Sequence, residues 1–407
     1  MANNFKNTSL VTKIAVKEFL NQLVMGQKVD RQLDSQFHKV GATIQVRRPV
    51  MFESSDGATL GTATAIEERA ASVVLDQRKK VHFEITSQDM TLSVEDMTER
   101  YIRPAMEELA QKVETSIANV YANIGNFTGT PGTTPTTFLT VASTGAVLSK
   151  LGVPMGDRCL FVTADTSVAL SDGLKGVFPE SIARKAIEEA TVGRYGRFDI
   201  YESNSLATHV VGAHGGTPLV NGATQGVTYA VGGDSNTQSL ITDGWTSSIT
   251  DVLLAGDVIT IAGVNSVNRR TRVDTGSLQT FTVIANATSG ASTGPATLTI
   301  SPAMIIDGPY QTVTSAPLDN AVITVKTGTA GASYPQNLAF HKNAITLAMA
   351  PLDMPEDGAS ASRESFKGVS IRAIRQYDIS ADKTIFRFDI LYGVKAQNSD
   401  FAVRLTG

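Results

Sequence analysis

The chain has 407 residues, of which 42% are hydrophobic, 18% are charged and one is cysteine. At about 150 residues per domain this is roughly 2.7 domains, which is enough chain to bury a sizeable core. The net charge of −4 argues against a dedicated nucleic-acid-binding protein, because such domains are normally basic; it does not exclude a protein that encloses nucleic acid. A single cysteine excludes an intrachain disulfide, so the fold does not depend on an oxidising compartment.

No signal peptide or membrane segment is expected. Lys13, Lys17 and Glu18 interrupt any apolar core near the N-terminus. No run reaches about 18 uninterrupted apolar residues. We therefore expect a protein that is made in, and stays in, a cytosol.

The first two segments are an arm helix and a hairpin. Residues 9–26 have apolar side chains at helical spacing after the capping residues 7–9. Residues 43–47 and 80–85 alternate as strands around a turn signal at 54–57. A long β-hairpin that projects from a core explains this segment; it is marginal alone in water and would lie on a neighbouring subunit. Its charged residues include Arg47, Arg48, Glu67, Glu68, Arg69, Arg78, Lys79 and Lys80.

The clearest element is a helix over residues 93–124. Its apolar residues recur at spacings of three and four on one face, and a helix of this length spans ~45 Å. Pro104 either kinks it or marks its first turn. Gly125 and the Gly/Thr/Pro tract through Pro135 end it. The apolar face consists of Ile102, Met106, Leu109, Val113, Ile117, Val120 and Ile124.

The rest of the chain predicts a mixed core that is interrupted by a β domain. Residues 139–203 alternate helix and strand, with helices at 142–151, 166–174 and 182–190 and strands at 159–163 and 197–202. Residues 204–336 have short alternating runs between turn residues and few basic residues, which predicts an all-β domain. Its strands are expected at 226–231, 257–262, 280–284, 296–300 and 321–326. The mixed pattern resumes at 337, with a helix or strand at 343–350 and a strand pair at 369–376 and 383–392.

Motifs for catalysis or metal binding are absent from the sequence. It contains no phosphate-binding loop, dinucleotide fingerprint, nucleophile elbow or kinase signature. The five histidines lack metal-ligand spacing. One tryptophan and 6% aromatic residues provide no stacking platform for single-stranded nucleic acid.

Four isolated features are better explained by structure than by chemistry. Cys159 lies in a buried strand and is expected to be an inert core thiol. His209 and His214 are interpreted as part of a solvated connector. Asp353, Glu356 and Asp357 lack the oxygen pattern of a calcium loop. The basic run 269–272 is read as a strand-end surface or a salt-bridge site rather than a phosphate contact.

The order of these elements resembles the Hong Kong 97 fold of tailed-phage major capsid proteins. The segment 191–203 looks like the axial-domain strand entry of that fold, and the segment 337–346 looks like the return into its closing strands. The stretch 255–264, followed by 281–283, looks like the inserted β-barrel of the P-twenty-two-like coat protein family. In that family a protruding charged loop of the inserted domain bridges capsomers; the corresponding stretch 232–236 is short here, and Asp234 is its only charge. No lysine–asparagine crosslink pair is assignable.

The resemblance implies an α+β fold with six parts. These are an N-terminal arm (1–40), an extended β-hairpin loop (41–88), a peripheral domain with a spine helix (89–135), the first part of the axial domain (136–203), the inserted β-barrel (204–336) and the return with the closing strands (337–407).

The implied function is that of a major capsid protein, and not of an enzyme. Its expected partners are other copies of itself in pentamers and hexamers, a scaffolding protein, a portal protein and a decoration protein. It would enclose double-stranded DNA without sequence-specific binding, use no cofactor or metal, and be assembled into virions in the host bacterial cytoplasm. The inter-subunit contact candidates are the charged hairpin residues named above and Asp234. The alternatives are another β-rich virion protein, from a tail tube or decoration, or a glycan-binding or hydrolytic enzyme, for which the sequence offers little aromatic material.

Overall fold

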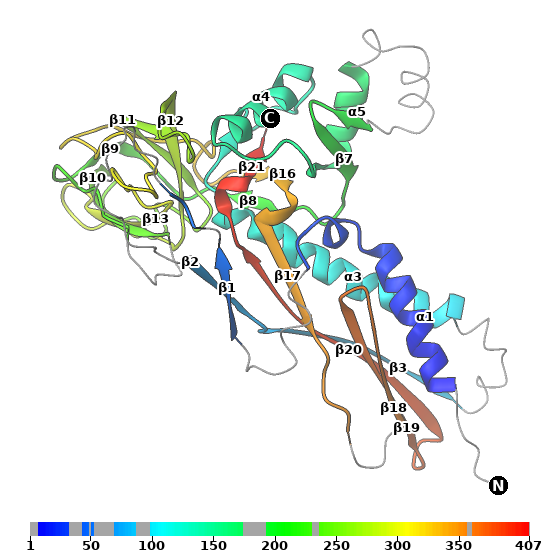
Figure 1. The fold of residues 1–407 in the computed structure, drawn as a ribbon. Coiled ribbons are helices and arrows are strands. Elements are labelled where there is room, and N and C mark those ends of the chain that lie inside the picture. Colours follow the sequence, from blue (N-terminus) through cyan, green and yellow to red (C-terminus); the bar gives the residue numbers. More distant parts are fainter. Residues whose placement is uncertain are drawn as a thin grey trace. The chain divides into compact units, whose positions relative to one another are not determined.

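The computed structural model describes residues 7–31, 43–48, 50–52, 69–86, 98–173, 193–229, 236–355 and 360–406 (Figure 1). The chain forms two compact units. Unit 1 comprises residues 1–45, 72–117 and 345–395, and unit 2 comprises residues 46–71, 118–344 and 396–407. Both helices and strands occur, in agreement with the expected α+β class.

Unit 1 is built on a five-stranded sheet. Its strand order is β17-β20-β19-β18, and β3 pairs with β20 on the edge opposite β19. The predicted hairpin near the C-terminus is confirmed, because Asp378 of β19 pairs with Lys383 of β20. The ambiguous run at 343–350 contains a strand. The bounds are β3 (Gln77–Thr86), β17 (Ile345–Ala350), β18 (Ser360–Phe366), β19 (Val369–Asp378) and β20 (Lys383–Ala396).

The pairing predicted within residues 41–88 is wrong. Strand β1 (Thr43–Arg48) pairs with β2 (Arg69–Val74), whereas β3 pairs antiparallel with β20. The reason is apolar alternation, since Phe83 of β3 lies opposite Phe386 of β20 with ring centroids 5.6 Å apart. Such cross-strand pairs select the register that buries one face of a strand.

The spine helix is shorter in its α-helical part than predicted. A π turn, η3 (Thr98–Ile102), leads into α3 (Arg103–Ala118), which continues as a 3-10 turn, η4 (Asn119–Asn123). At 1.5 Å per residue the 16 residues of α3 span about 24 Å. Pro104 is the second residue of α3 and directly follows the π turn, in agreement with its missing N–H, which interrupts regular α-helical hydrogen bonding. The predicted apolar face is confirmed, because each of its members is buried: Ile102, Met106, Leu109, Val113, Ile117, Val120 and Ile124.

The arm helix α1 (Asn7–Gln22) packs in unit 1 against β18, β19 and the turn at the start of the spine helix. A buried carboxylate joins the residues after α1 to α3. The Glu114 oxygens accept the backbone N–H groups of Met25 and Gly26, both at 2.9 Å. Burial raises the pKa of Glu114 to about 7, against the opposing effect of these backbone donors.

Unit 2 contains a six-stranded sheet of order β4-β21-β16-β5-β7-β6. Helices α4 (Phe138–Lys150) and α5 (Ala164–Gly173) accompany it, close to the predicted helices; residues 182–190 lie outside the described residues. The sheet brings β16, which follows the insertion, beside β5, which precedes it. The strands are β4 (Phe127–Thr128), β5 (Arg158–Val162), β6 (Arg194–Tyr195), β7 (Phe198–Glu202), β16 (Asn337–His341) and β21 (Ala402–Leu405).

Residues between β7 and β16 form a nearly closed barrel. Its strand order is β14-β11-β12-β13-β10-β9, and β9 and β14 approach each other through a bridge between Leu219 and Val322. Strands β8 (Thr208–Val210) and β15 (Ser333–Pro335) pair where the chain enters and leaves. The barrel strands are β9 (Gly216–Val220), β10 (Gln238–Trp245), β11 (Val258–Val267), β12 (Asp274–Val283), β13 (Ala296–Ser301) and β14 (Ile323–Val325).

Most of the predicted barrel strands are present. The exception is 226–231, where Val227 makes only an isolated bridge to Ile305, while β9 and β10 were not predicted. Trp245 lies in the barrel core, 3% exposed. No helix among the described residues is long and apolar enough to cross a membrane.

Ionisation of Glu114 is predicted to destabilise unit 1. The folded-state pKa of about 7 exceeds the ordinary value of 4.5, so the folded state binds the proton more tightly. Stability that is present below pH 4.5 should be lost as the pH rises through about 7. The loss is about 3 kcal/mol, at 1.4 kcal/mol per pKa unit.

Urea unfolding followed by circular dichroism between pH 4.5 and 8 tests this. Glu114→Gln should remove this part of the pH dependence, whereas Glu107→Gln, a change of an exposed residue on the same helix, should retain it. Equal pH profiles for wild type and Glu114→Gln would contradict the assignment.

Candidate functional site

The predicted contact residues fall into two groups. The side chains of Arg47 and Arg69, and all of Glu67, Glu68 and Asp234, lie outside the described residues; the remaining four lie on strands. Arg48 is half-buried on β1. Arg78, Lys79 and Lys80 lie on β3, opposite Leu391, Ile390 and Asp389 of β20.

Strand alternation separates these three basic residues. Arg78 and Lys80 project to the same side of the sheet as His82, whereas Lys79 projects to the side of Phe83. Arg387 of β20 and Arg372 of β19 project to the same side of the sheet as Arg78 and Lys80, as the strand register shows. We call this side the basic face and define it by Arg78, Lys80, His82, Arg363, Arg372 and Arg387.

One carboxylate organises the centre of the basic face. Asp389 is fully buried, and its oxygens accept hydrogen bonds from Arg372 and from Nε of Arg387, the latter at 2.8 Å, with Arg78 at 3.7 Å. Burial alone raises the pKa of Asp389, but the hydrogen bonds and the positive charges of Arg372 and Arg387 together outweigh burial and hold the pKa below its ordinary value. A buried charge requires such partners, so Asp389 fixes the arginines in place.

A shallow groove of about 440 Å³ lies on the basic face. Its charged lining residues are Lys80 and Arg387, with His82 beside them, and no carboxylate of the described residues lines it. A groove of this composition suits an acidic peptide segment. The other lining residues are Pro355, Ile374, Gln376 and Ile385.

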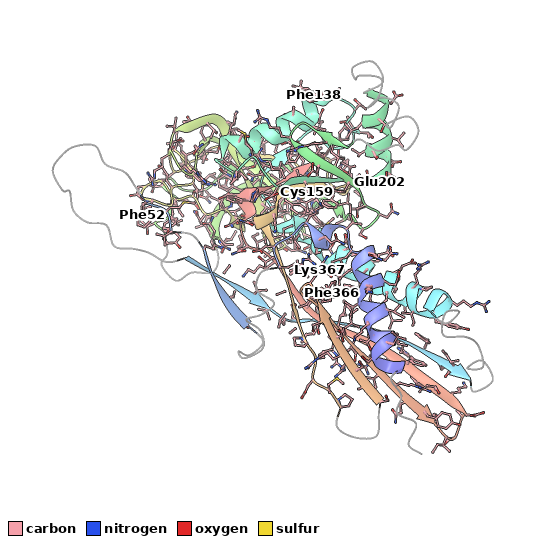
Figure 2. All side chains as sticks on the ribbon, turned by 45° about the vertical axis from the view of Figure 1, so that its right-hand side comes forward. Phe52, Phe138, Cys159, Glu202, Phe366 and Lys367 are labelled. Atoms are coloured by element: carbon pink, nitrogen blue, oxygen red, sulfur yellow. The ribbon has the colours of Figure 1, made fainter. Side chains whose placement is uncertain are left out.

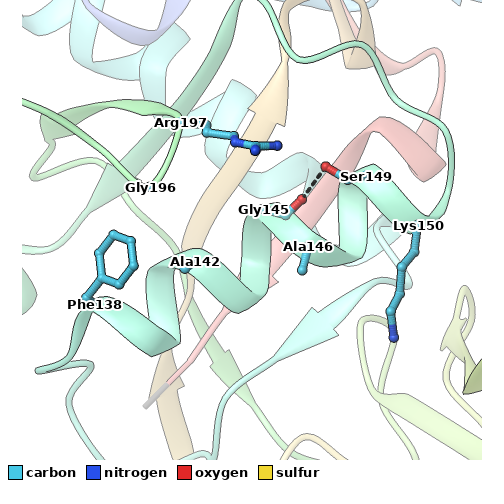
Figure 3. A pocket seen from close by; sticks show the side chains of 8 residues that line it. All are labelled: Phe138, Ala142, Gly145, Ala146, Ser149, Lys150, Gly196 and Arg197. Atoms are coloured by element: carbon cyan, nitrogen blue, oxygen red, sulfur yellow. Dashed lines mark hydrogen bonds between the residues drawn. The ribbon is translucent and has the colours of Figure 1, made fainter.

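A second groove, of about 640 Å³, lies on unit 2 between α4 and the turn from β6 to β7 (Figure 3). Its floor is made of the small residues Ala142, Gly145 and Ala146. Arg197 and Lys150 are its charged residues, and Ser149 donates its hydroxyl to the carbonyl of Gly145. The described lining residues include no histidine, cysteine or carboxylate.

The third candidate is a buried polar cluster where the barrel adjoins the six-stranded sheet in unit 2. The carboxylate of Asp257 is fully buried and accepts four hydrogen bonds, at 2.8 to 3.0 Å. Burial alone raises the pKa of Asp257, but the hydrogen bonds from His209, Leu254 and Thr327 outweigh burial and lower it. The donors are Nε2 of His209, the backbone N–H groups of Gly212 and Leu254, and the hydroxyl of Thr327.

His209 was interpreted from the sequence as part of a solvated connector, and that interpretation is wrong. Its side chain is 2% exposed and lies between Asp257 and the hydroxyl of Tyr121, 3.1 Å from Nδ1. A neutral imidazole that donates from Nε2 and accepts at Nδ1 satisfies both contacts. The partner carboxylate is 48 residues away in sequence, so local spacing could not reveal it. His214 is half-buried, with Nε2 3.0 Å from the carbonyl oxygen of Gly328.

Arg404 of β21 completes the cluster. It is fully buried, donates from Nη1 to the carbonyl of Gly256 at 2.7 Å, and lies over the rings of Tyr121 and Phe127. Burial lowers its pKa to about 10, against the opposing effects of Tyr121 and Asp257, so it stays protonated at neutral pH. The cluster therefore joins the base of the barrel to a strand of the sheet.

The other sequence features have structural roles. Arg269 forms a two-point salt bridge with Asp400, with both N–O distances 3.1 Å, which confirms a salt-bridge site within 269–272. Cys159 is a buried thiol in β5, inside unit 2 (Figure 2), and its Sγ donates to the carbonyl of Phe340 at 3.5 Å. Asp353 lies in an exposed loop, and Glu356 and Asp357 lie outside the described residues. The described part of the chain contains no cluster of His, Cys, Asp and Glu that could hold a metal ion.

Comparisons with known proteins place the whole chain in one family. The family model described as "P22 coat protein - gene protein 5" matches residues 1–407. A "Major capsid protein" of Acyrthosiphon pisum secondary endosymbiont phage 1 is 26% identical over 410 residues, covering 96% of each chain.

Two solved structures illustrate the similarity in fold. A structure from Mycobacterium phage Che8 has a TM-score of 0.48 and 15% identity, and the match covers 94% of this chain and 90% of that one. The CUS-3 coat protein I-domain is 28% identical over 28% of this chain and 96% of its own, with a TM-score of 0.20. These scores are below 0.5, so the assignment depends on the family match.

Asp257→Ala is predicted to destabilise unit 2 by about 3–5 kcal/mol, because it leaves four buried donors, one on an imidazole, without an acceptor. Urea unfolding monitored by fluorescence of Trp245, the single tryptophan, measures this. Asp274→Ala, which removes an exposed carboxylate from the same barrel, should cost less than about 1 kcal/mol. Similar unfolding midpoints for the two variants would contradict the role assigned to the cluster.

Proposed function

Because this chain belongs to the P22 coat protein family and is the major capsid protein of a phage, we propose that its copies form the pentamers and hexamers of an icosahedral shell around the double-stranded DNA of a tailed phage. The net charge of −4 suits a protein that encloses DNA without reading its sequence. The protein is a virion component, and we place its assembly in the host bacterial cytoplasm. The match of the whole chain to a coat protein family favours a capsid protein over the alternatives of a tail-tube or decoration protein.

The proposed contact between copies joins the hairpin loop of one copy to the basic face of the next. One observation carries it, namely charge complementarity. Residues 53–68 contain Glu53, Asp56, Glu67 and Glu68 and no lysine or arginine. Among the residues that the structure describes, the groove on the basic face is lined by Lys80 and Arg387 and by no carboxylate. Opposite charges at the rim of an interface steer association and fix its register.

Rings follow from such a contact because it is heterologous. The loop is one patch and the basic face is another, so each copy uses both, and a rotation that closes makes a ring. Each contact can be weak, because copies held by other contacts meet it at high effective concentration. Of the residues predicted as contacts, Lys80 and Arg78 thus receive the loop, while Glu67 and Glu68 belong to it.

Further partners follow from the same function. A scaffolding protein would contact the arm at 1–40, and portal and decoration proteins would join the shell. The described lining residues of the two grooves include no nucleophile–base pair, which is in keeping with a structural role. We propose that the protein is not an enzyme; turnover of any substrate by purified shells would contradict this.

Reversal of charge on the basic face is predicted to block shell formation. Lys80→Glu places a carboxylate in the groove and should repel the acidic loop, so that folded subunits remain unassembled in electron micrographs at low salt. Glu67→Lys combined with Lys80→Glu should restore particles. Lys112→Glu is the control. It makes the same charge change at an exposed side chain of α3, and this variant should assemble. Closed shells from Lys80→Glu alone would refute this contact.

The hairpin itself is tested by replacing residues 53–68 with a short Gly/Ser linker. A larger deletion through residue 80 is unsuitable, because Gln77–Lys80 pair with Tyr392–Asp389 in the sheet of unit 1. The linker variant should remain folded by circular dichroism and yield no closed shells. Closed shells from it would contradict the proposed mechanism.

A further inference from the structure

The base of the hairpin is attached to the inserted barrel of the same chain. Met51 packs beside Tyr310 in a small apolar cluster, and its backbone N–H donates to the hydroxyl of Tyr310 at 3.4 Å. The remaining members of this cluster are Ala303, Ile305, Val227 and Tyr229, all from the barrel segment.

A second contact holds the next residue. Nη2 of Arg272 donates to the carbonyl oxygen of Phe52 at 2.9 Å. The Phe52 side chain itself is 72% exposed, and Figure 2 shows it at the edge of unit 2. The barrel therefore holds the backbone of two consecutive residues, Met51 and Phe52, directly before the loop 53–68. We call Tyr310 and Arg272 the clasp.

The clasp residues are themselves rigidly placed. The Tyr310 ring is 6% exposed and lies 4.2 Å from the ring of Tyr229, measured between centroids. The loop that carries Arg272 is closed by Asn268, whose side-chain oxygen accepts the N–H groups of Arg270 and Thr271. Two stiff loops thus present a phenol and a guanidinium in fixed positions.

Arg269 links the clasp to the six-stranded sheet. Its guanidinium donates to Asp400, two residues before β21, and from Nη1 to the carbonyl of Thr312 at 2.7 Å. Thr312 lies two residues from Tyr310, and Arg269 lies three residues from Arg272. Hydrogen bonds to the segment that precedes β21 thus lie within two or three residues of both clasp residues along the chain.

We propose that the inserted barrel supports the hairpin, and that Tyr310 and Arg272 are positioning residues for shell assembly. An isolated two-stranded hairpin is marginally stable in water. Fixing its base in advance lowers the conformational entropy lost when the loop binds a neighbouring copy, which increases affinity without any new contact. This inference rests on the proposed docking of the hairpin on an adjacent copy.

The test uses the full-length double variant Tyr310→Ala/Arg272→Ala. Hydrogen exchange in unassembled subunits should become about tenfold faster at the amides of 50–52, because a hydrogen bond and a packing contact are lost. Shell yield at a fixed subunit concentration, counted by electron microscopy, should fall about tenfold or more. Arg270→Ala, a change of an exposed arginine in the same loop, is the control and should leave both unchanged.

Two results would overturn the proposal. Unchanged exchange at 50–52 in the double variant means that the barrel does not hold the hairpin base. Faster exchange with normal shell yield means that the clasp does not serve assembly. If the double variant fails to fold, Tyr310→Phe replaces it, since this change keeps the stacking on Tyr229 and removes only the hydroxyl.

Met51→Ala examines the same contact from the hairpin side. Its effect on shell yield should be non-additive with that of Tyr310→Ala, and strict additivity would contradict the clasp. The outcome is separable from that of the proposed function. If the linker variant of 53–68 still forms shells, hairpin docking is refuted, whereas the exchange measurement on 50–52 continues to report whether the clasp exists.

Discussion

The buried carboxylate of Asp257 is the interaction on which the architecture of unit 2 depends. An insertion between β7 and β16 has to leave one sheet and return to it, and the backbone at this junction must find partners away from water. Asp257 collects donors from the entering segment, His209 and Gly212, and from Thr327 on the leaving segment. Arg404 of the sheet donates to Gly256 beside it. The barrel is thereby tied to the sheet at the point where the chain crosses between them.

Ionisable groups serve two different purposes in this protein. Asp257, Asp389 and Glu114 are buried and hold strands, arginines and a backbone turn in place, and each is costly unless its partners are present. Lys80, His82 and Arg387 line an open groove, where charge contributes little to stability and is free to recognise another copy. The arginines around Asp389 belong to both groups, because a buried carboxylate orients the guanidinium groups that the surface presents.

Patterns that depend on neighbouring residues were predictable. The apolar face from Ile102 to Ile124, the strand at Cys159 and the hairpin across 379–382 follow from spacing alone, because helix and strand periods are local properties. The partner of β3 was mispredicted, since two alternating strands near each other in sequence look like a hairpin whether or not a better apolar partner exists. That partner, Phe386 and its neighbours, lies about 300 residues away and is recognised only when the faces are matched in space.

Composition, residue order and local periodicity by themselves determined the α+β class, the inserted β domain and the resemblance to a phage capsid family. Those properties are carried by residues close together in the chain. Only the tertiary structure decided that His209 is buried against Asp257, that Lys80 lies opposite Asp389 of β20, and that Arg272 and Tyr310 hold the residues before the hairpin loop. Each of these contacts joins segments that are at least 48 residues apart in the chain. Burial and hydrogen-bond partnership at such separations are set by how the whole chain packs, and no local spacing encodes them.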